Sequence, residues 1–164
     1  MRRISALPNT ALPFGERKGP TPIGLYNFGV SYLDTARSAM QSNCKIAFSD
    51  PIEHLFAHGV ELIFKADLMR NDTLDNVRQR FGHDLVGLRY AITSEFVLRW
   101  RIDAEFDDIV RYLDLGHSGR GYRHRYLQPG FRQGVSLSTI GAATARFNDQ
   151  DRTGLVQLFG GVIA

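Results

Sequence analysis

The sequence contains a single cysteine, Cys44, so no disulfide can form within the chain. A lone thiol without a disulfide framework is typical of proteins from a reducing compartment. No apolar run approaches the roughly 18 residues that cross a membrane. No apolar stretch follows Arg2 and Arg3, as a secretory signal would require. These absences predict a cytoplasmic protein without a membrane partner.

A strong excess of one charge is also absent. The 20 lysines and arginines stand against 17 acidic residues, which gives a net charge of +3. That balance permits contact with nucleic acid without requiring it. The length of 164 residues and the hydrophobic content of 43% suit one domain with a real core.

Proline is scarce outside residues 1–22, which hold four of the six prolines and four basic residues against one acidic residue. Proline in this density, without apolar periodicity, predicts an irregular basic N-terminal arm. Such an arm can touch RNA, pack on a neighbouring subunit or remain solvated. Residues 23–164 are expected to form one domain.

No segment alternates apolar and polar residues over the length of a strand. Apolar residues instead recur at intervals of three and four, as Leu25, Phe28, Tyr32 and Ala36 do, which is typical of amphipathic helices. The sequence therefore predicts an all-α, up-and-down bundle of four to six helices. Helices are expected over residues 23–43, 49–70, 74–80, 82 to about 100, 103–115 and in two runs within 136–164.

Residues 49–70 predict the central helix of this bundle. Asp50 can cap its N-terminus, Pro51 suits the first helical position, and Glu53 completes a capping box. Apolar residues cover most of its circumference, which is typical of a buried helix.

A polar line interrupts that apolar surface, because His54, His58, Glu61 and Lys65 follow one another at spacings of four, three and four. Glu61 precedes Lys65 in the order that favours an ion pair along a helix. The line can fix the packing of a bundle or dimer, bind a metal through its histidines and Glu61, or face a substrate. Because Lys65 is adjacent and no fourth ligand is evident, we expect no metal and no cofactor.

Residues 116–134 contain five glycines and no acidic residue, and they predict a basic loop. Arginines for phosphates and tyrosines for bases are typical of contacts with single-stranded nucleic acid. The candidate nucleic-acid-binding residues are Arg120, Tyr122, Arg123, Arg125 and Tyr126. Alternatively, the arginines pair with the acidic helix at 103–115 that precedes them.

Two motifs in this order resemble the HEPN superfamily of small helical proteins. They are Pro51…His58-x-x-Glu61-Leu62-x-x-Lys65-Ala66-x-Leu68 and Gly82-His83-Asp84-Leu85-x-x-Leu88. The resemblance covers residues 23–115 well and the C-terminal part poorly. It implies a helical bundle, often a homodimer, that acts with nucleotidyltransferase-type or other nucleic-acid-processing partners, as in toxin–antitoxin pairs.

Many HEPN proteins are metal-independent ribonucleases with an arginine a few residues before a histidine, near the start of the last core helix. Arg78 and His83 match this spacing, although they precede an earlier helix. We therefore expect a HEPN-like module without the ribonuclease motif. The first alternative is a ribonuclease in which His83 is the acid/base beside Asp84, and Arg78 or Arg80 holds the phosphate. The second is RNA binding without cleavage through residues 116–132.

Overall fold

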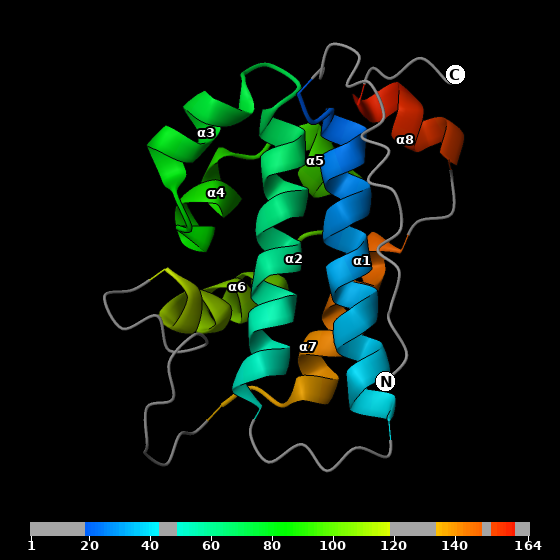
Figure 1. Ribbon diagram of the computed structural model, residues 1–164, viewed down its shortest axis with the longest axis vertical. Coiled ribbons are helices and arrows are strands. Elements are labelled where there is room, and N and C mark those ends of the chain that lie inside the picture. The colour runs from blue at the N-terminus through cyan, green and yellow to red at the C-terminus, as the bar shows by residue number, and fades with distance from the viewer. Residues whose placement is uncertain (1–18, 43–48, 119–133, 149–151, 160–164) are drawn as a thin grey trace, which may run out of the picture.

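The structure is a computed structural model, and it describes residues 19–42, 49–118, 134–148 and 152–159 (Figure 1). Within these ranges every regular element is helical, so the predicted all-α class is confirmed. These ranges hold eight α-helices, more than the four to six expected. The elements are α1 (Pro22–Gln41), α2 (Asp50–Leu68), α3 (Leu74–Phe81), α4 (Leu85–Ala91), α5 (Ser94–Arg99), α6 (Ala104–His117), α7 (Leu137–Thr144), the 3-10 helix η1 (Ala145–Phe147) and α8 (Arg152–Phe159).

Helices α1 and α2 run antiparallel along the long axis of the molecule (Figure 1). Two glycines let them touch backbone to backbone. A Cβ added at Gly29 would lie 2.8 Å from the carbonyl oxygen of Gly59, and one added at Gly59 would lie 2.9 Å from that of Gly29. This close approach fixes where the two helices cross.

Helix α2 is the centre of the fold, as its sequence predicts. Besides α1, the helices α4, α6 and α7 pack against it, and Phe56, Val60, Ile63 and Phe64 are fully buried. This chain covers most of the apolar surface of α2 with its own helices, so that surface gives no support for a homodimer, which stays a prediction.

Two predicted helix starts are confirmed by their caps, since the side chain of Thr73 accepts from Asn76 N and that of Asp103 accepts from Phe106 N. The helix expected from residue 82 instead begins at Leu85, because Asp84 is its N-cap and accepts from Gly87 N at 2.7 Å. The predicted cap of α2 is wrong by one residue, because Ser49 is the N-cap and Asp50 is already helical. The predicted N-terminal arm of residues 1–22 overlaps α1, because Thr21 caps this helix and Pro22 is its first residue.

The single helix expected from residue 82 to about 100 is two helices, α4 and α5. A buried carboxylate on α2 explains the break. Asp67 is fully buried and accepts hydrogen bonds from Thr93 N at 2.7 Å and from Thr93 Oγ1 at 3.0 Å. The same Oγ1 accepts from Phe96 N and caps α5. Thr93 therefore donates hydrogen bonds to Asp67 of α2 and caps α5, and it does not extend α4.

Helix α6 extends to His117, so the prediction of a loop from residue 116 is wrong by two residues. Helices α7, η1 and α8 follow residues 119–133 in the chain. They correspond to the two helical runs predicted within residues 136–164. Tyr26 on α1 anchors this tail, because its hydroxyl donates to the carbonyl oxygen of Phe147 at 2.5 Å. Its ring also packs on Phe159 of α8.

None of the helices in the described ranges has the length and apolar content needed to span a membrane.

Candidate functional site

The polar line on α2 meets further polar groups inside the bundle. Glu61 is only 2% exposed, and its Oε1 accepts a hydrogen bond from Lys65 Nζ at 2.5 Å. Its Oε2 lies 3.0 Å from His83 Nδ1 and is also hydrogen-bonded to His117 Nε2. His58 Nδ1 lies 3.7 Å from the same oxygen. We call these five residues the Glu61 hub.

Three separate segments supply the hub, and local structure sets each position. Lys65 stands one helical turn after Glu61, so the predicted ion pair is confirmed. Gly82 ends α3 with φ at +53°, a conformation that favours glycine, and His83 follows it. Lys65 Nζ also donates to the carbonyl oxygen of Gly82 at 2.5 Å, which ties this turn to α2. His117 is the last residue of α6.

The predicted polar line and His83 supply four of the five hub residues, and His117 is the one that the sequence analysis does not identify. His54, the remaining residue of the polar line, lies beside the hub. Its ring centroid is 6.0 Å from that of His58 and 5.6 Å from that of His117. His117 is 1% exposed, whereas the sequence predicts a basic loop that begins at Gly116 and includes His117. The helical period could have identified it, because Leu113 is buried and residue 117 lies one turn further on the same face.

Burial by itself would raise the pKa of the Glu61 carboxyl. Contacts with the surrounding histidines, foremost His117, and with Lys65 outweigh burial and hold this pKa far below its usual range. Burial lowers the pKa of His117 below 6.5, against the opposing attraction of Glu61. At neutral pH the hub therefore holds an ionised carboxylate and a neutral His117.

These charge states fix which ring nitrogens carry protons. An ionised carboxylate only accepts hydrogen bonds, so His117 presents Nε2–H and His83 presents Nδ1–H to Glu61. In its neutral form each ring keeps a lone pair on its other nitrogen. For His83 this is Nε2, and its side chain is 38% exposed. His83 is thus the partly accessible imidazole of a buried network.

The hub opens onto a cleft of about 560 Å³, which we call the hub cleft. Its polar lining includes Arg78 with His83, Lys65, Glu61 and His58. The structure therefore brings Arg78 and His83, the pair with the ribonuclease spacing, into one cavity. Its apolar lining consists of Pro20, Leu25, Phe28, Leu62 and Leu74.

Other predicted site residues lie elsewhere. The carboxylate of Asp84 caps α4 and does not line the cleft. Arg80 forms an ion pair with Asp72 at 3.5 Å and lies over the ring of Phe81. The candidate nucleic-acid residues Arg120, Tyr122, Arg123, Arg125 and Tyr126 are outside the described residues.

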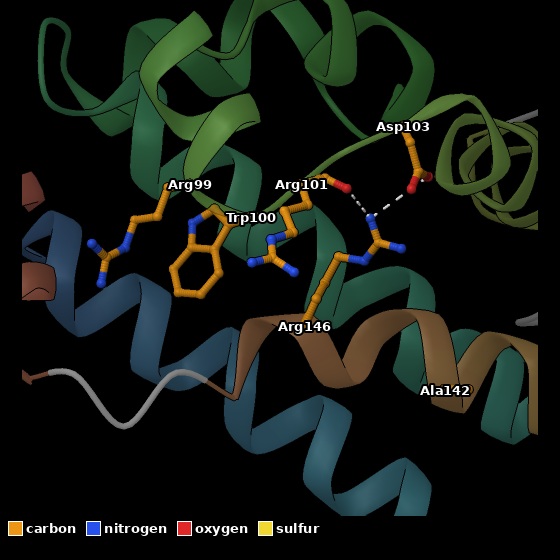
Figure 2. Close-up of a pocket in the computed structure, with 6 residues that line it drawn as sticks. All are labelled: Arg99, Trp100, Arg101, Asp103, Ala142 and Arg146. Carbon is orange, nitrogen blue, oxygen red and sulfur yellow. Dashed lines mark hydrogen bonds and ion pairs between the residues drawn. The ribbon is translucent and has the colours of Figure 1, made fainter.

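A second pocket, of about 520 Å³, lies where α5, α6 and η1 meet, and Figure 2 shows Arg99, Arg101 and Arg146 around it. Arg146 donates to the carbonyl oxygen of Arg101 and lies 3.7 Å from Asp103 Oδ1. These contacts hold η1 against the turn between α5 and α6. The pocket has cationic groups but no histidine, so its lining offers less for acid–base chemistry than the hub cleft.

His58, Glu61 and His117 could each offer one ligand atom to a metal, and these atoms lie within 4.8 Å of one another. However, the ammonium of Lys65 already neutralises the carboxylate from 2.5 Å. A divalent cation would have to share that carboxylate with a buried positive charge. The donor set fits a hydrogen-bonded network better than a metal centre.

Comparison of the chain with protein-family models, with curated proteins and with solved structures finds no match, so the chemistry of the hub cleft rests on its own geometry.

Proposed function

We propose that the hub cleft cleaves RNA by metal-independent acid–base chemistry. The observation that carries this proposal is the placement of Arg78 and His83 in one cavity with Lys65 and Glu61. A histidine oriented by a carboxylate, together with a cation for the phosphate, meets the needs of this reaction. The alternative that the sequence offered for Arg78 and His83 thereby gains support over a module without a ribonuclease site.

His83 is the general base of the proposed reaction. Its Nδ1–H donates to Glu61 at 3.0 Å, which orients the ring and leaves the Nε2 lone pair for the substrate. Nε2 takes the proton of a ribose 2′-hydroxyl as O2′ attacks the neighbouring phosphorus. The bond from phosphorus to O5′ breaks, which gives a 2′,3′-cyclic phosphate and a 5′-hydroxyl. Glu61 stabilises the imidazolium that forms.

The remaining groups of the cleft stabilise charge and supply a proton. The exposed guanidinium of Arg78 can hold two phosphate oxygens, which no ammonium does with the same geometry. His58, the other imidazole of the cleft, is the candidate acid for the leaving O5′. Lys65 is too deeply buried to bind the phosphate, and its role in the proposal is to keep Glu61 ionised.

The composition of the basic segment supports RNA as the substrate. Residues 119–133 carry four arginines and no acidic residue, and they follow His117 closely in the sequence. Its formal charge can attract the phosphates of a strand whose scissile bond reaches the cleft.

The test is cleavage of a labelled single-stranded RNA in the presence of EDTA. We expect wild type to cleave and His83→Gln or Arg78→Ala to lose activity by about a hundredfold or more, as removal of a general base or a charge clamp does. An oligonucleotide with one 2′-deoxyribose should resist cleavage at that position. Products should carry a cyclic phosphate.

Arg80→Ala is the matched control, because Arg80 lies on the same helix as Arg78 but outside the cleft. It should keep wild-type activity. If His83→Gln cleaves like wild type, or if activity needs a divalent cation, the proposal is wrong. The rival function is a HEPN-like interaction module in which the hub only fixes packing. That function predicts no cleavage by folded wild type.

A further inference from the structure

We infer that Phe28 forms a nucleobase subsite of the hub cleft, so that the cleft binds one nucleotide of RNA by its base as well as its phosphate. This inference deepens the proposed function and rests on it for the identity of the ligand. The sequence pattern places Phe28 on the inward face of its helix with Leu25 and Tyr32. In the structure Phe28 is instead 55% exposed, at the edge of the cleft.

The exposed ring packs against a second aromatic side chain. Phe28 packs edge-to-face on Tyr32, with 5.2 Å between ring centroids. Tyr32 in turn packs edge-to-face on His58 of the hub, at 4.6 Å. These contacts join the outer aromatic ring to the catalytic cluster through one intermediate side chain. A ring restrained in this way loses little freedom when a planar ligand stacks on it.

The lining of the cleft combines apolar and charged groups, and a nucleotide has both kinds of part. Phe28 lines it together with the apolar residues Pro20, Leu25, Leu62 and Leu74. Arg78, His83 and Lys65 add positive charge and proton donors to the same lining. A volume of about 560 Å³ lies within the range of small-ligand sites. A purely apolar ligand would leave the charged groups unused, and a bare phosphate would leave Phe28 exposed.

A base stacked on Phe28 also positions the RNA strand for the proposed reaction. Stacking on an aromatic ring tolerates any base, because every base has a π face. The subsite therefore fixes the distance of the scissile phosphate from His83 without selecting a sequence. Phe28 is a positioning residue, and it does not touch the reacting atoms.

The experiment measures equilibrium binding of nucleoside monophosphates and of ribose 5-phosphate to the full chain by calorimetry. We expect AMP and CMP to bind wild type about tenfold more tightly than ribose 5-phosphate, since base–aromatic stacking contributes that order of affinity. Phe28→Ala should remove this difference and Phe28→Tyr should keep it. Because Phe28 is already exposed, the alanine variant should fold, which circular dichroism checks.

Tyr90→Ala is the matched control, since Tyr90 is an aromatic residue 66% exposed and outside the cleft. It should leave the tenfold difference intact. Equal affinity for nucleotides and ribose 5-phosphate in wild type overturns the inference, as does a difference that survives Phe28→Ala or the absence of binding at millimolar concentration. Binding needs no turnover, so the subsite can stand where cleavage fails, and cleavage can stand where the subsite fails.

Discussion

The carboxylate of Glu61 on α2 is hydrogen-bonded within its own helix, to the turn between α3 and α4, and to α6. Lys65 binds one oxygen, and His83 and His117 bind the other. Because Glu61 and Lys65 are almost fully buried, neither charge can turn to water if its partner is lost. The stability of the whole molecule should therefore depend on this single side chain.

Glu61→Gln tests that dependence with almost no change of shape. We expect it to lower the free energy of unfolding by about 3 kcal/mol, because it leaves the ammonium of Lys65 buried without a counter-charge. Glu95→Gln provides the comparison, since Glu95 pairs with Arg70 but its side chain is 61% exposed. It should cost less than about 1 kcal/mol. Urea unfolding measures both, and equal effects would contradict the role given to burial.

The same residues make stability depend on pH. The pKa of His117 is lowered, so the unfolded chain takes up this proton before the folded protein does. Stability should fall as pH drops below about 6.5, by at most about 1.4 kcal/mol per pH unit for this one group. The lowered pKa of Glu61 adds a further loss as pH falls below about 4.3.

His117→Gln isolates the first of these two losses. A glutamine amide can donate to Glu61 in place of Nε2–H but does not titrate. The variant should show a shallower decrease of unfolding free energy between pH 7.5 and 5 than wild type, in urea titrations with EDTA present. An unchanged slope would contradict the role given to His117 among the groups that face Glu61, which are Lys65, His58, His83 and His117.

At the scale of helices, the crossing of α1 and α2 depends on glycine. Gly59→Ala should destabilise the protein by about 2 kcal/mol, because the new Cβ would lie 2.9 Å from the oxygen of Gly29 and 2.6 Å from Leu33 Cδ2. Gly141→Ala on α7 is the control, since its Cβ would meet no atom closer than 3.7 Å. Helix propensity should make that variant more stable by up to about 1 kcal/mol. Thermal and urea unfolding would show whether the two signs differ.

Helix period and capping residues predict most elements, because these signals are local. Thr73 and Asp103 cap the helices that begin at Leu74 and Ala104, as expected. The break at Thr93 could not be predicted, because its cause is a carboxylate 26 positions earlier in the chain, at Asp67. A threonine within an apolar helical run carries no sign of such a distant partner.

The candidate site divides in the same way. Glu61 and Lys65 are one turn apart on one helix, so their ion pair follows from spacing alone. His83 and His117 reach Glu61 only through the packing of α4 and α6, 22 and 56 positions away. The exposure of Phe28 likewise depends on which segments pack over its ring, and the helical period does not show this.

For the whole molecule, the N-terminal and C-terminal helices share one aromatic cluster. Tyr26 of α1 stacks on Trp100 at 5.5 Å and contacts Phe159 of α8 at 5.2 Å. Trp100 also packs on Phe147 of η1. The first and last helices of the described residues thus meet at one side chain, which supports the prediction of a single cooperative domain.

Trp100 is the only tryptophan in the chain, so its fluorescence reports on this cluster alone. In urea, the fluorescence transition should coincide with the loss of helical circular dichroism, as two-state unfolding requires. Tyr26→Phe should shift both transitions together by about 1–2 kcal/mol, because it leaves the buried carbonyl of Phe147 without its hydrogen bond. If the fluorescence change came first, the C-terminal helices would unfold separately from α1 and α2. The single-domain prediction would then be wrong.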